Sequence, residues 1–287
     1  MNGSSTQIAR VVASLGLFLT AYANVAYSAT NDIPGLVLHF SMDELRAGAF
    51  VDRVTSNEIG RATNVRILAQ GKLNGACEFA KKNSFVSVPN TAALNPKRIT
   101  FALWFRTGKE SFPARFLLEK GSERGYALSI AGGGKENNRR GKLRTTVNGH
   151  DGFSDASVTD DLWHHAAVVF DGRVVKLYVD GLLQKQTVVV PGGELVPNDC
   201  DLTLGLNRSA PSTQARETSF DGAIDEVTIF NRALDESEIK RLLSSVKPKF
   251  TKQQVERRVK ELKDLLSRGL ILQDFYDRKV QECEVVE

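Results

Sequence analysis

The sequence predicts a mainly β protein, an antiparallel β-sandwich followed by a small C-terminal helical hairpin. Short runs of strand-favouring residues recur from Leu36 to Phe230, separated by Asn-Gly, Asp-Gly and glycine-rich turns. No long helical pattern interrupts these runs, which argues against a sheet of alternating strands and helices. Apolar residues take up helical spacing only beyond Asp235. These three observations predict one sandwich domain with a helical appendage.

The expected strands follow one another at short intervals along the chain. The strongest, Thr100–Arg106, alternates so that Phe101, Leu103 and Phe105 share one side, which is the pattern of a strand with one buried face. The others are Leu36–Phe40, Ala76–Phe79, Ser84–Val88, Arg115–Leu118, Tyr126–Ile130, Lys142–Val147, the two arms of Trp163–Gly181, Thr187–Val190, Leu202–Leu206 and Ala223–Phe230.

The segment Trp163–Gly181 predicts a β-hairpin, because two strand-like runs flank Asp171-Gly172 and this dipeptide suits the positive φ angles of a two-residue turn. Such a turn would place Phe170 opposite Arg173 and would bury one face of the ribbon. The other face mixes aromatic and hydrogen-bonding groups, so it either lines a ligand surface or is simply a half-covered sheet. If it lines a ligand surface, the candidate binding residues are His165, Lys176 and Tyr178.

Residues 1–29 have the pattern of a secretory signal peptide. Arg10 is the sole charge before the apolar run Val11–Ala23, and small residues suitable for a processing site follow that run. The alternative is an uncleaved N-terminal anchor. No other segment is long and apolar enough to cross a membrane. We therefore expect a secreted or periplasmic, cell-envelope protein with no membrane span after signal cleavage.

Three cysteines are present, and three cannot all pair within one chain. Cys77 and Cys200 lie in strand-like stretches and would form a disulfide if those strands were neighbours, whereas Cys283 lies in the helical tail. The sequence leaves this bridge open.

Helix is expected only near the C-terminus. Asp235 and Glu238 form a capping-box pattern at the start of a helix that closes the domain. After a linker at 247–249, apolar residues repeat at helical spacing as far as Gly269, a typical helix stop, and a second short helix is expected around Phe275–Cys283.

Several phrases of the sequence occur together in a known order: Leu38–Glu44, Gly71–Ala76, Ile99–Phe105, Asp161–Val168, Leu177–Gly181 and Phe220–Val227. In this order they resemble the LamG-like jelly-roll domain of the concanavalin A-like lectin/glucanase group. The resemblance covers residues 36–246 and implies a domain at 30–246. It implies much less about function, because the group contains lectins, adhesion modules and glycosidases.

The tail resembles a second family. Leu262–Ile271 followed by Phe275–Lys279 is similar to the short C-terminal helical hairpin called SHOCT. The resemblance implies a linker and hairpin domain at 247–287 and a homo-oligomer formed through residues 250–287. Leu272 stands where such domains commonly carry Thr, so Asp274 is the alternative cap of the second helix.

No catalytic pattern is recognisable in the sequence. The glucan-cleaving enzymes of the group resemble one another in a Glu-x-Asp-x-x-Glu strand, which is missing here. The nearest acidic pairs, Asp43-Glu44 and Asp225-Glu226, are adjacent residues whose side chains should point to opposite faces of a strand. We therefore expect no enzyme, with a glycan-active hydrolase or lyase whose carboxylates come from separate strands as the alternative.

The resemblance also implies a structural Ca²⁺ near the rim of the sheets. Asp43 follows the first strand and Asp225 lies in the last, and the first and last strands of such sandwiches commonly pair. Carboxylate and carbonyl oxygens are the ligands that calcium prefers. The alternative is that Asp225 only accepts hydrogen bonds from a turn.

Charge is unevenly distributed along the chain. Residues 81–144 carry fourteen Lys or Arg against four Glu, whereas residues 145–246 carry eight basic against sixteen acidic residues. The densest basic cluster contains Arg139, Arg140 and Arg144, and a basic surface attracts anionic polymers. Sulfated or uronic-acid glycans are the expected partners and nucleic acid is not. Alternatively, the basic half pairs with the acidic half of the same molecule.

The leading hypothesis from the sequence is a non-catalytic recognition module that binds carbohydrate or an extracellular protein, with a self-associating tail. A structural envelope protein that binds no glycan is a further alternative.

Overall fold

The computed structural model describes residues 30, 32–80, 82–108, 114–121, 123–133, 138–208, 218–245, 249–250, 252–270, 273, 276, 280 and 284–285. The chain divides into two compact units, of which the larger is Ile33–Lys240. The smaller unit takes in described residues on either side of that range. The expected signal peptide at residues 1–29 lies outside the described residues.

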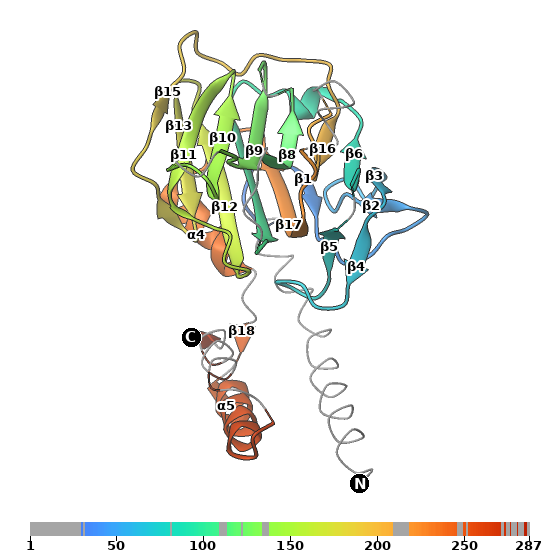
Figure 1. The fold of residues 1–287 in the computed structure, drawn as a ribbon, viewed down its shortest axis with the longest axis vertical. Coiled ribbons are helices and arrows are strands. Elements are labelled where there is room, and N and C mark those ends of the chain that lie inside the picture. Colours follow the sequence, from blue (N-terminus) through green and yellow to red (C-terminus); the bar gives the residue numbers. More distant parts are fainter. Residues whose placement is uncertain are drawn as a thin grey trace. The chain divides into compact units, whose positions relative to one another are not determined.

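The larger unit is a sandwich of two antiparallel sheets, which confirms the expected fold class (Figure 1). Sheet A has the strand order β14-β13-β12-β7-β17-β5-β4, with β1 beside β17 and β15 beside β13. Its strands are β1 (Leu36–Phe40), β4 (Arg66–Leu68), β5 (Ala76–Phe79), β7 (Ile99–Arg106), β12 (Trp163–Phe170), β13 (Val174–Val179), β14 (Leu182–Leu183), β15 (Val188–Val189) and β17 (Gly222–Phe230).

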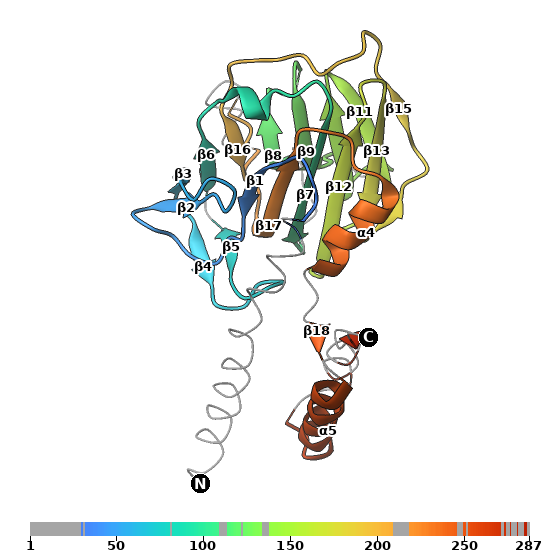
Figure 2. The same ribbon diagram turned by 180° about the vertical axis from the view of Figure 1, so that it is seen from behind.

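Sheet B has the strand order β11-β10-β9-β8-β16-β6-β3-β2. Its strands are β2 (Ala49–Val51), β3 (Glu58–Thr63), β6 (Phe85–Val88), β8 (Arg115–Lys120), β9 (Tyr126–Ile130), β10 (Lys142–Val147), β11 (His150–Ser157) and β16 (Leu202–Leu204). A 3₁₀ turn, η1 (Ala92–Leu94), joins β6 to β7. Figure 1 looks onto sheet B, and Figure 2 looks onto sheet A from behind.

The hydrophobic core lies between the two sheets. Strand β7 pairs with both β12 and β17, and its alternating residues Phe101, Leu103 and Phe105 are fully buried in the core, as the sequence pattern predicts. Because every second residue of a strand faces inward, the remaining side chains of each sheet form its outer face. The two outer faces therefore carry the side chains that do not enter the core between the sheets.

The first and last strands of the sandwich are hydrogen-bonded neighbours. In the antiparallel pair of β1 and β17, His39 lies opposite Thr228 and Phe40 opposite Val227. This pairing confirms the expectation on which the approach of Asp43 to Asp225 rested.

The predicted hairpin is present as β12 and β13, but its turn is longer than expected. Phe170 pairs with Val175 rather than facing Arg173, so four residues lie between the paired positions. Gly172 has a positive φ of 93°, while the Asp171 carboxylate accepts hydrogen bonds from the N–H groups of Arg173 and Val174. Relative to the register expected for a two-residue turn, the β13 residues opposite β12 are shifted by two positions. Because side chains alternate with a period of two, each one stays on its expected face.

No disulfide joins Cys77 to Cys200. Cys77 lies in β5 of sheet A, whereas Cys200 precedes β16 of sheet B, so the two strands are not neighbours. The bridge that the sequence left open is excluded by the topology. Cys77 is a buried thiol, and burial holds its pKa well above the usual range.

Helix α4 (Glu236–Ser245) begins at the predicted capping box. The Glu238 N–H donates to the Asp235 carboxylate and the Asp235 N–H donates to the Glu238 carboxylate, both at 2.9 Å. These reciprocal bonds satisfy two backbone donors that a helix start leaves without partners. Figure 2 shows α4 on the outer side of sheet A, beside β12 and β13.

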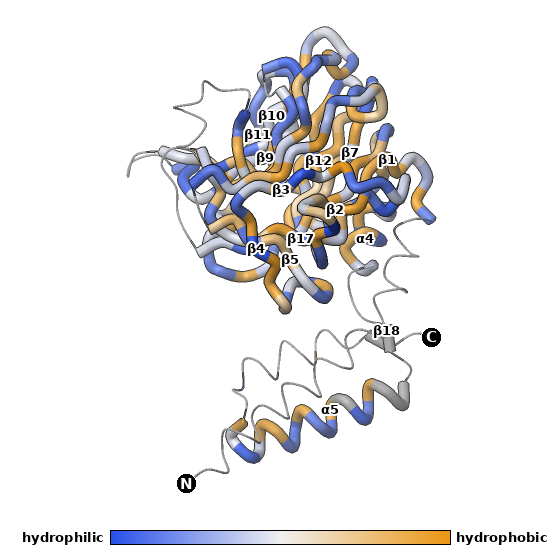
Figure 3. The backbone as a smooth tube through the Cα atoms, turned by 90° about the vertical axis from the view of Figure 1, so that its right-hand side faces the viewer, coloured by the Kyte–Doolittle hydropathy of each residue, from blue (hydrophilic) through white to orange (hydrophobic). Residues whose placement is uncertain are grey.

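The smaller unit contains helix α5 (Lys252–Ser267) and a two-residue parallel pairing of β18 (Lys249–Phe250) with β19 (Glu284–Val285). Helix α5 alternates between apolar and polar residues along its length (Figure 3). It ends two residues before Gly269, the predicted helix stop: Gly269 has a φ of 65°, and the Leu270 N–H donates to the Leu265 carbonyl at 2.9 Å. Most of the expected second helix, 275–283, lies outside the described residues. Among the described helices, none is both long and apolar enough to span a membrane.

Candidate functional site

The outer face of sheet B carries the basic residues that the sequence singled out. In β10, Leu143 and Val147 point into the core, so the alternation places Arg144 on the outer face. Arg144 lies opposite Phe153 of β11, and its Nη2 atom is 2.8 Å from the Asp151 carboxylate. Arg144 is about one-third exposed and its Nε atom has no hydrogen-bond partner.

Arg139 joins this group from the turn before β10. Its guanidinium carbon lies 4.3 Å from the centroid of the Phe153 ring, which is a cation–π stack. Gly141 completes the turn with a φ of 75°, and a Cβ there would lie 2.6 Å from the Ser157 hydroxyl. Arg139 and Arg144 are therefore brought together around Phe153, while Arg140 lies half-buried in the same turn.

A second arginine–phenylalanine stack lies on the other side of the same face. The Arg208 guanidinium carbon is 5.0 Å from the centroid of Phe85 in β6, and its Nη1 atom donates to the Ser87 hydroxyl. Sequence reasoning missed Arg208, because it belongs to the acidic half of the chain and lies far from the basic cluster in sequence. The alternation in Ser84–Val88 was the one signal that put Phe85 outside the core.

A row of residues, four polar and one alanine, connects the two stacks across the face. The register aligns Thr146, Ala127, Glu119, Thr203 and Ser87 on successive strands from β10 to β6. The central side chains of this row are buried, although they point away from the core. The face thus has an arginine and an aromatic ring at either end of this row.

The hairpin candidates lie on the outer face of the other sheet. Tyr178 is buried, and this burial together with the charges of Glu236 and Asp235 in and before α4 raises its pKa. Lys176, opposite Val169, keeps a partly exposed side chain. The structure therefore leaves Lys176 more accessible than Tyr178.

His165 is buried beside Trp104, with the two ring centroids 5.2 Å apart. Burial lowers the pKa of His165 to about 4, so its imidazole is neutral at physiological pH. The adjacent His164 differs, because its ring lies between the carboxylates of Asp180 at 2.7 Å and Asp160 at 3.0 Å. These hydrogen bonds raise the pKa of His164.

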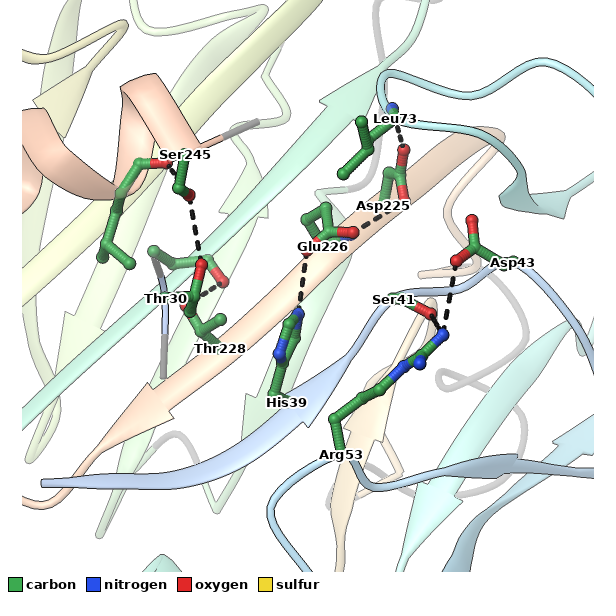
Figure 4. Close-up of polar contacts among 12 residues, drawn as sticks. Thr30, His39, Ser41, Asp43, Arg53, Leu73, Asp225, Glu226, Thr228 and Ser245 are labelled. Carbon is green, nitrogen blue, oxygen red and sulfur yellow. Dashed lines mark hydrogen bonds and ion pairs between the residues drawn. The ribbon is translucent and has the colours of Figure 1, made fainter. Parts of the chain in front are cut away.

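The acidic pair Asp225 and Glu226 departs from the sequence expectation. A β-bulge between Asp225 and Thr228 turns both side chains to the outer side of β17, rather than to opposite faces (Figure 4). Glu226 adopts a φ of 48°, which non-glycine residues rarely do. Its carboxylate lies 2.8 Å from His39 Nε2, whereas Asp225 sits opposite Trp104.

The Asp225 carboxylate anchors the Gly71–Gly75 loop. It accepts hydrogen bonds from the N–H groups of Lys72 and Leu73 at 2.8 and 2.9 Å, and its second oxygen accepts the Glu226 N–H. A Cβ on Gly71 would lie 1.8 Å from the Gly75 carbonyl oxygen, so this tight loop requires glycine. Burial and the charge of Glu226 hold the pKa of Asp225 well above its usual range.

Asp43 binds the other end of the same loop. Its carboxylate accepts the Gly75 N–H at 2.9 Å and lies 3.6 Å from the Arg53 guanidinium. Asp43 and Asp225 thus approach the same loop, as expected. Their oxygens already accept backbone N–H groups, and the Asp43 carboxylate also faces the Arg53 guanidinium. Among the described residues, no group of three or more His, Cys, Asp or Glu could hold a metal ion. This donor set does not fit a calcium ion.

Comparison with known proteins places this architecture in a family. The family model described as the concanavalin A-like lectin/glucanases superfamily matches residues 80–240, which is more than half of the 287-residue chain. No curated protein matches the chain in sequence.

Similar solved structures share the fold at low sequence identity. Domain 4 of an extracellular arabinanase from Geobacillus stearothermophilus, in complex with arabinotriose, has a TM-score of 0.54 and 18% identity, covering 72% of this chain and 98% of that one. The binding domain of Paraclostridial Mosquitocidal Protein 1 has a TM-score of 0.55 and 18% identity, covering 76% of this chain and 53% of that domain.

A Trypanosoma rangeli sialidase has a TM-score of 0.56 and 18% identity, covering 74% of this chain and 32% of that one. The chain thus spans about half or less of the toxin domain and the sialidase, and at these identities the likeness shows the fold. Together with the family match, the two antiparallel sheets show that this protein belongs to the concanavalin A-like lectin/glucanases superfamily.

Proposed function

We propose that this protein is a non-catalytic recognition module that binds an anionic glycan on the outer face of sheet B. The observation that carries the proposal is the stacking of Arg139 on Phe153 at 4.3 Å, with Arg144 opposite the same ring. A guanidinium held against an aromatic ring keeps its N–H edge pointing outward, where it can pair with a carboxylate or sulfate group.

The position of the Arg144 side chain on this face supports this proposal. Asp151 neutralises part of its charge, but about one-third of the side chain remains exposed on this face. The second stack, Arg208 on Phe85, provides another cation on the same face. A polymer with repeated negative charges would contact both ends of the face, whereas a single small anion would contact one.

The ligands of similar solved structures are consistent with a recognition module, but they do not indicate one particular ligand. The arabinanase domain is solved with arabinotriose, and the binding domain of botulinum neurotoxin DC is solved with rat synaptotagmin II. Domains of this fold therefore bind either saccharides or proteins. The cations of sheet B favour an anionic saccharide, and an extracellular protein with an acidic surface is the alternative partner.

The test is a glycan array with sulfated, uronic-acid and neutral glycans, followed by affinity measurements at several salt concentrations. The Arg139→Ala/Arg144→Ala double variant is expected to lose affinity for the anionic glycans by about tenfold or more, because two charge-assisted contacts disappear. The matched control is Arg173→Ala, which removes an exposed arginine from the hairpin turn of sheet A. Equal binding by the double variant and the control, both folded, would rule out this face.

A glycan-active enzyme is the second candidate function, favoured by one observation. The bulge in β17 brings Asp225 and Glu226 to one side of the strand, and Glu226 holds a strained backbone conformation of the kind that clusters at active sites. Reducing-sugar assays on every glycan that binds would distinguish the two functions. Turnover that disappears in Glu226→Gln would favour the enzyme, and binding without turnover favours the recognition module.

We further propose that residues 1–29 direct the protein to the cell exterior or the periplasm and that residues 250–287 mediate self-association. The amphipathic pattern of α5 supports the second role, because its apolar stripe would be covered in an oligomer (Figure 3). Light scattering on the intact chain and on a chain ending at residue 246 tests it. An unchanged mass per particle, after allowing for the deletion, would contradict self-association.

A further inference from the structure

Two buried side chains on the outer face of sheet A carry polar atoms without partners. Trp104 in β7 and His165 in β12 are paired across the two strands, and only 5% and 2% of their surfaces are exposed. Neither the Trp104 Nε1 atom nor the His165 Nδ1 atom makes a hydrogen bond. Buried polar groups nearly always have a partner, so such a pair of neighbouring exceptions calls for an explanation.

The chemistry of these two atoms indicates what the partner is. An indole nitrogen can only donate a hydrogen bond, so the group opposite Trp104 Nε1 must be an acceptor. His165 is neutral, since its pKa is lowered to about 4 by burial, and a neutral imidazole donates from one of its two nitrogens. Both rings can therefore donate to oxygen atoms of one acceptor group.

Lys72 adds a cation to the same place. Its ammonium nitrogen lies 4.3 Å from the centroid of the Trp104 ring, and its positive charge opposes protonation of His165. The main chain at Lys72 is held by the Asp225 carboxylate, which fixes the base of the side chain beside Trp104. An acceptor at this position would thus face two N–H donors and one positive charge.

The neighbouring carboxylates are already engaged elsewhere. Asp225 accepts three backbone N–H groups from the Gly71–Gly75 loop and β17, and Glu226 is bonded to His39. Asp180 is bonded to the His164 ring and to the His165 N–H. None of these oxygens accepts a hydrogen bond from the two unpartnered nitrogen atoms, so the described residues supply no acceptor for them.

We propose that Trp104 Nε1, His165 Nδ1 and Lys72 Nζ form a binding site for a carboxylate group. The positive charge of Lys72 attracts an anion, and two N–H donors match the two oxygens of a carboxylate. The site is on sheet A, whereas the proposed glycan surface is on sheet B, so this inference does not rest on the proposed function. A small carboxylic acid and the carboxylate of a sugar acid share this chemistry.

The two tryptophans of the chain make the site directly observable. The ¹⁵N-labelled full chain is titrated with sodium acetate at constant ionic strength while the indole N–H resonances of Trp104 and Trp163 are followed. Trp104→Phe and Trp163→Phe variants assign the two signals. The Trp104 signal is expected to move and saturate, whereas the Trp163 signal should stay in place. Acetamide, which has the same shape without the charge, should have little effect.

The Lys72→Met variant keeps the apolar stem over Trp104 but removes the charge. Its affinity for acetate should fall by about tenfold or more, the loss expected for one charge-assisted contact. Lys97→Met, at an exposed lysine paired with Glu194, is the matched control and should bind normally. If Lys72→Met does not fold, calorimetry on Trp104→Phe replaces it, with the same expected loss.

Glucuronate as a second probe separates the two sources of carboxylate. Tighter binding of glucuronate than of acetate would identify a sugar acid, and the reverse would identify a small acid. A Trp104 signal that acetate does not move, or moves only as far as acetamide does, would overturn the proposal and leave an ordered water as the partner of these atoms.

Discussion

The Nε2 atom of His39 lies 2.8 Å from the Oε2 atom of Glu226, so a buried side-chain bond joins the first strand of the sandwich to the last (Figure 4). The bond exists because the bulge in β17 turns Glu226 away from the core, at the cost of a backbone φ of 48°. At Glu226 the bond to His39 therefore stabilises the fold while the backbone conformation costs stability, and substitutions can separate these two effects.

Glu226→Ala should lower the free energy of unfolding by about 1–3 kcal/mol, because it removes the bond to His39 and keeps a side chain in the strained conformation. Glu226→Gly removes the same bond but adopts a positive φ without strain, so it should be about 1 kcal/mol more stable than Glu226→Ala. Urea unfolding of the two variants measures the difference. If Glu226→Gly is the less stable of the two, backbone strain at this position does not contribute.

Asp225→Ala should be among the most destabilising substitutions in sheet A. Three backbone N–H groups, those of Lys72, Leu73 and Glu226, lose their acceptor, and the expected loss is about 3 kcal/mol or more. Thermal unfolding measures the loss, and Asp221→Ala, at the loop before β17, serves as a comparison. A loss no larger than that of Asp221→Ala would show that the Gly71–Gly75 loop finds other partners.

The raised pKa of Asp225 also predicts a pH dependence. A carboxyl group with a folded pKa above its unfolded value of 3.8 contributes stability that is fully present below 3.8 and is lost as pH rises through the folded pKa. The stability of the wild type relative to Asp225→Asn, which cannot gain a proton, should therefore rise as pH falls towards 3.8. A constant difference between the two proteins over that range would contradict the shift.

The contribution of His165 to folding stability should have the opposite pH dependence. Its pKa falls from 6.5 to about 4 on folding, so its contribution is present above pH 6.5 and is lost as pH falls towards 4. The loss should reach about 3 kcal/mol at most, since each pKa unit corresponds to about 1.4 kcal/mol. Urea unfolding of the wild type and of His165→Phe from pH 7 downward measures it, and parallel curves would contradict the shift.

His164 provides the matched control for that experiment. Its pKa is raised by hydrogen bonds to Asp180 and Asp160, so it stabilises the fold below pH 6.5 and loses that contribution as pH rises through the folded pKa. His164→Phe should therefore be more destabilising at pH 6 than at pH 9. The two adjacent histidines are expected to respond to pH in opposite directions.

Calcium should not raise the melting temperature, because the oxygens of Asp43 and Asp225 accept backbone N–H groups and Asp43 also faces Arg53. Differential scanning fluorimetry with CaCl₂ and with a chelator measures this. A rise with calcium that disappears in Asp43→Asn would restore the calcium site that the family resemblance implied.

Much of the fold could be predicted because its signals are local. The alternation of Phe101, Leu103 and Phe105, the capping box at Asp235 and the helix stop at Gly269 each depend on neighbouring residues. The hairpin was predicted in the right place, but its turn is longer than expected: Phe170 pairs with Val175, and the Asp171 carboxylate accepts the N–H groups of Arg173 and Val174.

The candidate site was predictable only in part. The cluster Arg139, Arg140 and Arg144 is visible as a dense basic segment, but the stacking on Phe153 depends on the pairing of β10 with β11. Arg208 could not have been found, because its partner Phe85 lies more than a hundred residues earlier in the chain. The bulge at Asp225 was missed because strict alternation predicts opposite faces for adjacent residues.

The sequence by itself determined that this protein is an antiparallel sandwich with a helical tail, because hydrophobic alternation and turn residues act over a few positions at a time. Only the tertiary structure decided which polar groups meet: His39 with Glu226, Asp225 with the Gly71–Gly75 loop, and Trp104 with His165 and Lys72. Those pairings depend on strand order and register, which arise when distant segments bury their apolar faces against each other.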